Sequence, residues 1–377
     1  MKSLCFLKTV PNYAPAILTF SLLLAPFAPA LFASERAIWV EQMQPISPEQ
    51  YVCRKAPATL SIDGKLNEPA WKEAEWTRDF VDIEGAAKPK PRFRTRAKML
   101  WDDQFLYLAA ELEEPHVWGT LTNHDSVIFH DPDFEVFLDP VGRTQPYYEF
   151  EMNALNTTWD LRLDKPYQDN GKAADAWEII GAKSAVHIDG TLNQPSDTDQ
   201  GWTVEIAFPW TAFAERARLG NAPKEAEQWR ISFSRVEWQI VITNGAYQKI
   251  PKTPENNWVW SPQGVIDMHR PEMWGIVQFT SRPAKEVIQV TPLPGKAARD
   301  CALEIYHAQR DFNKANQRWA TNLAGLNWTA SKSAAGIDAP RLKTTADGYT
   351  CTVGFRENGR HRSWQIRQDR LLTLDGR

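Results

Sequence analysis

The chain has 377 residues, of which 43% are hydrophobic and 24% are charged, so its composition excludes a largely disordered protein. Its formal net charge of −4 argues against a nucleic-acid partner, because such proteins usually carry a basic surplus that neutralises phosphates. The 26 prolines and 19 glycines favour many short strands and turns over long helices. The 17 tryptophans indicate either a Trp-rich core or a surface that stacks on flat ligands.

Residues 1–33 are predicted to be a secretory signal peptide. Two lysines precede an apolar stretch at 14–33, and small residues favour cleavage after Ala30 or Ala33. An uncleaved membrane anchor is the alternative, because the stretch approaches the ~20 residues of a spanning helix. Two prolines within the stretch favour cleavage, and no later segment has the length and apolar character of a span. We therefore expect a secreted or periplasmic protein.

The mature chain would keep three cysteines, Cys53, Cys301 and Cys351. Three cysteines allow at most one intramolecular disulfide, and Cys301 with Cys351 is a possible pair. Buried free thiols are the alternative. No pair has the C-x-x-C spacing of a metal or redox site.

A leader at 34–56 is followed by a region, residues 57–280, that alternates between strands and turns. A short helical turn is predicted near Pro69, and a short helix from 211 to about 219. Strands are predicted at 97–101, 105–112, 134–138, 147–153, 159–164, 202–208, 229–238 and 275–279. So many strands with so few helices predict an all-β fold, an antiparallel, jelly-roll-like β-sandwich.

Residues 281–295 are rich in Pro and Lys and are predicted to be a linker. Beyond them, apolar residues recur at steps of three and four from Cys301 to Trp319, which predicts an amphipathic helix of about five turns. Two alternating runs around Asn358 and Gly359 predict a hairpin. Residues 296–377 are thus predicted to form a small helix-plus-hairpin unit, and residues 34–282 are expected to fold without it.

The middle strands carry the candidate binding residues, because alternate residues of a strand face opposite sides of a sheet. The apolar faces, expected to form the core, carry Phe134, Val136, Leu138, Phe150, Met152, Trp159, Leu161 and Leu163. The opposite faces carry Asp133, Glu135, Glu149, Glu151, Asn153, Asp160 and Arg162. Carboxylate, amide and guanidinium groups exchange hydrogen bonds with sugar hydroxyls. The set therefore predicts a sugar-binding surface, with an ordinary solvated sheet face as the alternative.

Aromatic rings that could cover the apolar face of a sugar lie near these strands in the sequence. Trp118 and Phe129 flank the region, while Trp258 and Trp260 fall in a later turn-rich segment. We therefore expect these four side chains to be candidates for stacking.

Five segments together resemble the family 9 carbohydrate-binding modules. They are the hairpin at 97–108, Ile62-Asp63-Gly64 with Glu68 and Trp71, the segments 134–140 and 201–209, and Trp260-Ser261-Pro262 with Pro271 and Gly275. They occur in the family's order. The resemblance implies a sandwich that binds sugars, often at chain ends, between two aromatic rings. Such modules accompany enzymes that degrade xylan or cellulose and can hold structural calcium.

The resemblance also implies roles for single residues. Phe129 falls where the family has its first stacking ring, and Glu135 falls where it has a sugar-contacting carboxylate. Glu151 replaces a sugar-contacting arginine of the family, and Met268 replaces the second ring. Trp258, Trp260 or Trp274 is therefore expected to supply the missing ring, and Trp260 is preferred because it precedes Ser261-Pro262, which restricts the backbone.

Calcium is a further expectation, because Asp131 and Asp133, with Glu135, offer the oxygen ligands that this ion takes. Their spacing lacks the glycine and terminal glutamate of an EF-hand loop. No organic cofactor is expected.

A non-catalytic secreted protein with a glycan ligand of the xylan or cellulose class, acting in polysaccharide catabolism, is the preferred hypothesis. A glycoside hydrolase would need two carboxylates about 5–10 Å apart, and acidic residues are too plentiful for a chance pair to count. No H-E-x-x-H, G-x-S-x-G or Gly-rich phosphate motif occurs. The alternatives are a domain that binds b-type haem through Met268 with His269 or His130, and a scaffold module without a small ligand.

Overall fold

The computed structural model describes residues 33–213, 221–328 and 336–375. The predicted signal peptide lies outside these residues except for Ala33. Most of the helix predicted at 211–219 also lies outside them, and its described beginning belongs to a 3-10 turn at Trp210–Phe213.

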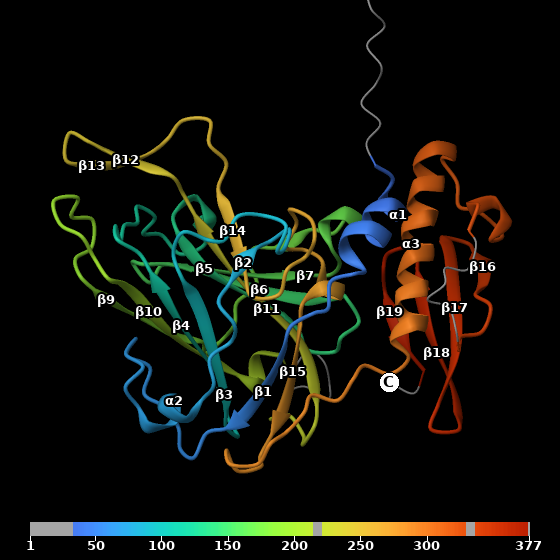
Figure 1. Ribbon diagram of the computed structural model, residues 1–377, viewed down its shortest axis with the longest axis horizontal. Helices are drawn as coiled ribbons and strands as arrows, with labels where there is room; N and C mark the ends of the chain where they lie inside the picture. Colours follow the sequence, from blue (N-terminus) through green and yellow to red (C-terminus); the bar gives the residue numbers. More distant parts are fainter. Residues whose placement is uncertain (1–32, 214–220, 329–335, 376–377) are drawn as a thin grey trace, which may run out of the picture. The chain divides into compact units, whose positions relative to one another are not determined.

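The main sheet contains thirteen strands within the described residues (Figure 1). They are β1 (Gln50–Lys55), β2 (Val81–Asp82), β3 (Thr95–Trp101), β4 (Phe105–Glu113), β5 (Asp133–Asp139), β6 (Tyr147–Asn153), β7 (Thr158–Leu163), β8 (Ala173–Ala174), β9 (Lys183–Asp189), β10 (Gly201–Pro209), β11 (Gln228–Glu237), β14 (Asn256–Val259) and β15 (Gly275–Thr280). Their order is β8-β7-β6-β5-β11-β15-β1-β3-β4-β10-β9, and β14 joins β11 to β2. All eight predicted strands are present.

The sheet curls so that its two halves pack against each other as a sandwich. Phe150 of β6 lies edge-on to Phe208 of β10, with ring centroids 5.1 Å apart, although these strands are well separated in the order of the sheet. Between the halves lie the predicted core residues Phe134, Val136, Leu138, Phe150 and Met152. The predicted β-sandwich is therefore confirmed. Its strands pair antiparallel except at β1, which runs parallel to β15 and β3.

The predicted hairpin of β3 and β4 shows how local chemistry sets the strand ends. Asp102 follows β3, and its Oδ1 accepts hydrogen bonds from the backbone N–H groups of Gln104 (2.7 Å) and Phe105 (2.8 Å). This side chain closes the turn in the way that aspartate commonly does. A second hairpin, β12 (Ile240–Thr243) with β13 (Ala246–Lys249), extends from the end of β11. The short helix α2 (Pro69–Glu73) begins at its proline, as predicted.

The C-terminal residues form one long helix packed on a small antiparallel sheet (Figure 1). The helix is α3 (Lys296–Asn316), and the strands are β16 (Arg341–Thr345), β17 (Gly348–Glu357), β18 (Arg360–Arg367) and β19 (Leu372–Leu374). The predicted helix and hairpin are thus present. Asn358 and Gly359 have φ angles of 49° and 76°, the left-handed conformations that a tight turn needs. Cys53, Cys301 and Cys351 are all buried free thiols.

Residues 34–56 were expected to be a leader, but they belong to the fold. They form α1 (Glu35–Ile38), a π-helical turn (Trp39–Met43) and β1. Trp39 and Met43 are buried in the same apolar cluster as α3 and the C-terminal strands. The sequence pattern missed this because Trp39 and Met43 find apolar partners only in the tertiary structure, where α3 packs against them. Among the described residues, the structure has no helix that combines the length and the apolar character of a membrane span.

Candidate functional site

A cavity of about 340 Å³ lies over β5, β6 and β7, on the face that points away from the sandwich core. In the register of these strands, Glu135 pairs with Glu151, and Glu151 pairs with Trp159. Directly paired residues of neighbouring strands project to the same face, so these three side chains form a row. The next row along the floor consists of Phe137, Glu149 and Leu161.

Three aromatic side chains border the acidic floor. Phe129 comes from a 3-10 turn (Ile128–His130), and its backbone N–H donates a hydrogen bond of 3.1 Å to Glu151 Oε2. Trp159 is half-buried, and Tyr167 is 42% exposed. Further lining residues are Ile83, Val236, Glu255, Asn257, Ile266, Asp267, Met268 and His269. The cavity therefore combines carboxyl groups with ring faces that a ligand can reach.

Burial controls the charge of the floor. Burial raises the pKa of Glu135 to about 7. The pKa of Glu151 is also raised, by burial first and then by the neighbouring Glu135 and Glu149 carboxylates. The pKa values of Asp133 and Glu149 are raised for the same two reasons. Part of the cluster therefore holds protons near neutral pH, and a protonated carboxyl can donate as well as accept a hydrogen bond.

Two acceptor atoms, one in the floor and one beside Glu135 on β5, have no hydrogen-bond partner in the part of the chain that the structure describes. Within the described residues, Asp133 Oδ2 and Glu149 Oε2 are buried and have no hydrogen-bond partner. Buried polar atoms are nearly always paired, so each such atom calls for a ligand, a proton or a water molecule. Among the residues that the structure describes, no lysine or arginine lines this cavity.

The structure brings together only some of the predicted binding residues. Phe129, Glu135 and Glu151 line the cavity. Trp258 and Trp260 do not, because they are 3% and 2% exposed and belong to the sandwich core. The prediction that they lie on an accessible loop is wrong. Trp258 is part of β14, and Trp260 packs between the rings of Tyr51 and Phe233. A ring enclosed in this way cannot stack on a sugar.

Three other predicted residues also lie outside the cavity. Trp118 is 6% exposed and lies near the ring of Tyr247. Asn153 Oδ1 accepts the backbone N–H groups of Leu155 and Thr157, so this side chain closes the turn between β6 and β7. Arg162 pairs in register with Tyr148, a core residue, and forms an ion pair of 3.0 Å with Asp164.

The two faces of β7 were predicted the wrong way round. Its apolar residues were expected in the sandwich core, whereas Trp159 and Leu161 line the cavity, and Asp160 and Arg162 take the other face. The reason is a second, smaller apolar cluster on the cavity side, which gives the apolar face of β7 a partner there. This cluster contains Ile83, Phe137, Tyr147, Leu161, Leu163, Val259, Met268 and Trp274. Alternation along one strand does not tell which of two apolar clusters a face joins.

Sequence reasoning therefore missed several cavity residues. Trp159 was assigned to the core, while Tyr167, Asn257 and His269 carried no signal as sugar-binding residues. Glu149 was on the predicted polar face but was not singled out. The register of β6 against β7 would have been the signal for Trp159, since it places that ring beside Glu151.

The two candidate calcium ligands have different surroundings. Asp131 is buried, and its two oxygens accept hydrogen bonds from Thr120 N, Thr120 Oγ1, Leu121 N and Asn153 Nδ2 at 2.7–3.0 Å. With four donors already bound, the Asp131 carboxylate has little capacity left to bind a calcium ion. Asp133 accepts one hydrogen bond, from Val236 N at 2.9 Å, and its other oxygen is open. Asp133, Glu135 and Glu151 offer ligand atoms within 4.8 Å of one another.

The residues of the haem alternative lie in different places. Met268 and His269 line the cavity, whereas His130 is exposed and is not among its lining residues. His269 Nδ1 lies 2.8 Å from the Tyr147 hydroxyl, and burial lowers the pKa of His269 to about 4. Haem carries two propionates, and an acidic cavity without lysine or arginine among its described lining residues disfavours them.

Comparisons with known proteins point to one family. Residues 62–234 match the family model described as carbohydrate family 9 binding domain-like, a range that includes all three strands of the cavity floor. A segment of 155 residues, 41% of this chain, is 26% identical to exoglucanase XynX of Acetivibrio thermocellus. A segment of the same length is 27% identical to endo-1,4-beta-xylanase A of Thermoanaerobacterium saccharolyticum. The matches cover 12% and 11% of these relatives, so the chain spans about a tenth of their length.

Among solved structures, the chain is similar to a family 9 carbohydrate-binding module from Caldicellulosiruptor kristjanssonii in complex with cellotriose. The TM-score is 0.41 and the sequence identity is 15%, over 65% of this chain and 100% of the other.

Proposed function

We propose that the protein binds a neutral glycan in the cavity over β5, β6 and β7, and the match of residues 62–234 to the family 9 model supports this proposal. The row of Glu135, Glu151 and Trp159, with Phe129 beside it, is the observation that carries this proposal. It places hydrogen-bonding groups next to ring faces, which is the combination that a sugar requires.

Each part of the cavity has a role in the proposed recognition. The carboxyl groups of the floor accept hydrogen bonds from sugar hydroxyls, and those that keep a proton donate one in return. The rings of Phe129, Trp159 and Tyr167 cover the apolar faces of the sugar. A ligand with its own carboxylate, such as a uronic acid, would meet several acidic groups and no lysine or arginine from the lining residues. The cavity volume is at the small end of the range of ligand pockets and suits one or two sugar rings at the end of a chain.

We further propose that the glycan belongs to the xylan or cellulose class and that the protein is secreted to act in polysaccharide catabolism. The support for the glycan class is that two relatives of the matched segment are named as an exoglucanase and an endo-xylanase. The support for secretion is the signal-peptide pattern of the first 33 residues.

A structural calcium ion is also proposed, at Asp133, Glu135 and Glu151 instead of at Asp131. The support is the open, buried Oδ2 of Asp133 beside two other carboxylates, because calcium takes several oxygen ligands. Calcium would neutralise part of the floor and hold these side chains in place. Addition of Ca²⁺ to the chelator-treated chain should then raise the melting temperature, and Asp133→Asn should abolish that rise.

The decisive experiment is a calorimetric titration of the chain from Ser34 onward with cellobiose, xylobiose and glucuronic acid. Trp159→Ala should weaken binding of the neutral sugar by about 30-fold or more, the loss expected for an aromatic residue that carries much of the binding energy. Trp76→Ala is the matched control, because Trp76 is also half-buried but lies outside the cavity. Equal affinities of the two variants, or a preference for the uronic acid, would contradict the proposal.

A further inference from the structure

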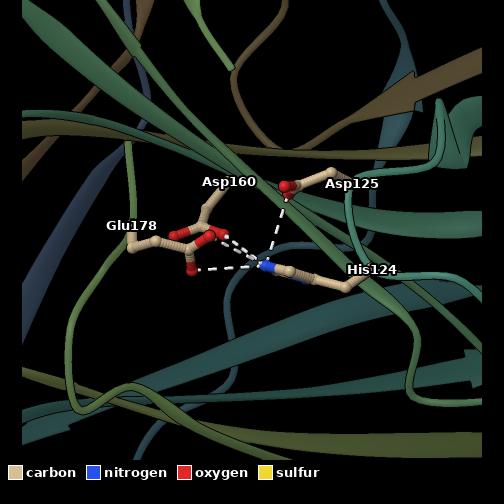
Figure 2. A group of neighbouring side chains, drawn as sticks. All are labelled: His124, Asp125, Asp160 and Glu178. Atoms are coloured by element: carbon tan, nitrogen blue, oxygen red, sulfur yellow. Dashed lines mark hydrogen bonds and ion pairs between the residues drawn. The ribbon is translucent and has the colours of Figure 1, made fainter. Parts of the chain in front are cut away.

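A second group of polar side chains, His124, Asp125, Asp160 and Glu178, is drawn in Figure 2. Asp160 lies on the face of β7 that points away from the cavity, opposite to Trp159 and Leu161. Glu178 comes from the segment after β8, and His124 and Asp125 come from the loop before Phe129. The distances from His124 Nε2 are 3.1 Å to Glu178 Oε1, 3.4 Å to Asp125 Oδ1 and 3.9 Å to Asp160 Oδ1. One ligand atom from each residue lies within 4.8 Å of all the others.

The tautomer of His124 is set by its other ring nitrogen. His124 Nδ1 lies 2.9 Å from the backbone carbonyl oxygen of Thr158, which can only accept, so Nδ1 carries a hydrogen and donates it. Without an ion, Nε2 lies 3.1 and 3.2 Å from the two Glu178 carboxylate oxygens and donates a hydrogen to them. A bound cation would replace that hydrogen and take up the Nε2 lone pair among the three carboxylates. A histidine whose second nitrogen donates to a carbonyl is the usual arrangement at metal centres, where this contact orients the ring.

Asp160 is the buried member of this group. Its carboxyl is 4% exposed, and one oxygen accepts a hydrogen bond from the backbone N–H of Ile179. The other oxygen points into the group and is 3.9 Å from His124 Nε2, beyond hydrogen-bond length. A carboxylate so far removed from water requires a positive partner, which either a protonated His124 or a bound cation can supply.

We propose that His124, Asp125, Asp160 and Glu178 form a binding site for a divalent transition-metal ion, with Zn²⁺ as the best fit. In a tetrahedral zinc site with bonds of 2.0–2.1 Å, neighbouring ligand atoms are about 3.4 Å apart. The three distances from His124 Nε2 bracket this value. An imidazole nitrogen among the ligands favours zinc over calcium, which takes oxygen ligands.

Such an ion would join three segments that are remote in the sequence. It would fasten the loop around His124 and Asp125 to β7, where Asp125 N already donates a hydrogen bond of 3.0 Å to Thr158 O. The same loop leads directly into the 3-10 turn that carries Phe129. Four protein ligands close a tetrahedral site, so its role is structural.

The test is a titration of the chelator-treated chain from Ser34 onward with Zn²⁺, followed by calorimetry and by thermal unfolding. His124→Gln and Glu178→Gln should each weaken Zn²⁺ binding by at least about tenfold. Both side chains are about half exposed, so both variants should fold. His361→Gln is the matched control, because the exposed fraction of His361 is 46% against 47% for His124, and it contacts a single carboxylate, that of Asp338. Its Zn²⁺ affinity should equal that of the wild type.

Substitution with Co²⁺ gives a second readout, because a tetrahedral Co²⁺ complex has an intense visible absorption band that His124→Gln should remove. Equal Zn²⁺ affinity of wild type and His124→Gln, or tighter binding of Ca²⁺ than of Zn²⁺ in a manner that depends on His124, would overturn the proposal. Sugar titrations with and without chelator are a separate measurement, so failure of the zinc site leaves the proposed glycan function standing.

Discussion

At the scale of single residues, the buried acids of the cavity make the stability of the fold depend on pH. Glu135 has a pKa of about 7 in the folded chain against 4.5 as its ordinary value. The folded state therefore binds this proton more tightly than the unfolded state does, and the free energy of unfolding falls as the pH rises from about 4.5 to 7. The difference between the two pKa values corresponds to about 3 kcal/mol.

We predict that the free energy of unfolding of Glu135→Gln falls less between pH 4.5 and 7 than that of the wild type, because the amide has no proton to lose. The measurement is urea unfolding at pH 4.5, 6 and 8 in the presence of EDTA, so that no metal ion neutralises the cluster. At pH 8 the variant should be more stable than the wild type, and at pH 4.5 the two should be similar. Glu111→Gln is the control, because Glu111 pairs with Arg94 and Arg96 near the surface. An unchanged pH profile in Glu135→Gln would show that another group titrates.

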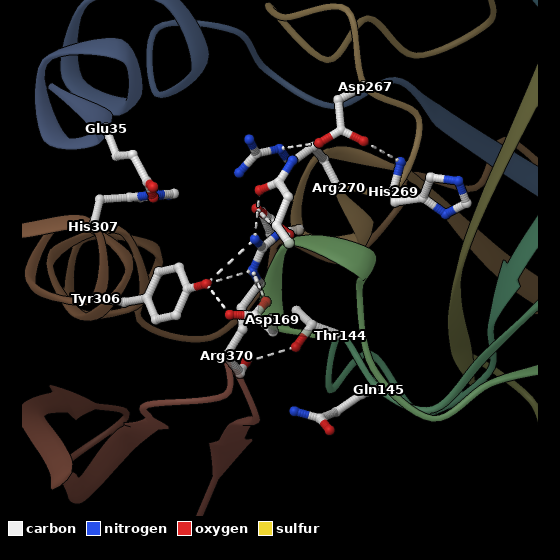
Figure 3. Close-up of polar contacts among 12 residues, drawn as sticks. Glu35, Thr144, Gln145, Asp169, Asp267, His269, Arg270, Tyr306, His307 and Arg370 are labelled. Atoms are coloured by element: carbon white, nitrogen blue, oxygen red, sulfur yellow. Dashed lines mark hydrogen bonds and ion pairs between the residues drawn. The ribbon is translucent and has the colours of Figure 1, made fainter. Parts of the chain in front are cut away.

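At the scale of elements, a buried ionic network joins the C-terminal strands to the sandwich (Figure 3). Arg370, in the turn between β18 and β19, is fully buried and forms ion pairs with Glu272 (3.1 Å) and Asp169 (3.0 Å). The Tyr306 hydroxyl of α3 accepts a hydrogen bond from Arg370 Nε and donates one to Asp169. Burial alone would raise the pKa of Glu272, but Arg370 and Arg270 keep it below its ordinary value. The network therefore positions α3 and β19 against the loops of the sandwich.

Arg370→Met is predicted to lower the free energy of unfolding by about 3–5 kcal/mol, because it removes the ion-pair partner of the buried Glu272 carboxylate and leaves the buried Asp169 with Arg310 alone. Arg367→Met is the matched control, at the end of β18 next to the same turn. Arg367 is 43% exposed and pairs with Asp369, and the loss of such a surface pair costs no more than about 1 kcal/mol. Denaturant unfolding of both variants tests this prediction. A similar small loss in the free energy of unfolding of each variant would show that the network does not join the C-terminal residues to the sandwich.

At the scale of the whole molecule, the C-terminal residues complete a core that begins at the N-terminus. Trp39, Met43 and Met273 are buried in one apolar cluster with residues of α3, β17 and β18. Residues Ser34–Arg377 accordingly form one unit. A chain cut at residue 282 would expose these three apolar side chains together with the Glu272 and Asp169 carboxylates that Arg370 pairs with.

The structure thus changes the expectation that residues 34–282 fold alone. We now predict that this fragment aggregates or unfolds without cooperativity, whereas the chain from Ser34 to Arg377 is soluble and cooperative. Light scattering and urea unfolding of the two chains test this. A fragment that stays monomeric with the same urea midpoint as the longer chain would show that the sandwich core is sufficient.

The sequence by itself determined the strands, their alternating faces and the resemblance to family 9 modules. Period-two patterns are local, so the main strands were found close to their true ends, and the predicted core residues of β5 and β6 are correct. Part of the cavity followed as well, because Phe129, Glu135 and Glu151 lie on or next to those strands.

Only the tertiary structure decided which rings a ligand can reach and which distant groups meet. Trp260 is enclosed because β15 passes so close to it that a Cβ atom on Gly275 would lie 2.5 Å from its ring. Trp159 is accessible because of the register between β6 and β7. His124 and Glu178 are 54 residues apart, and no spacing rule connects them. Burial and contact depend on how strands pack against one another, and a pattern along one strand does not contain that information.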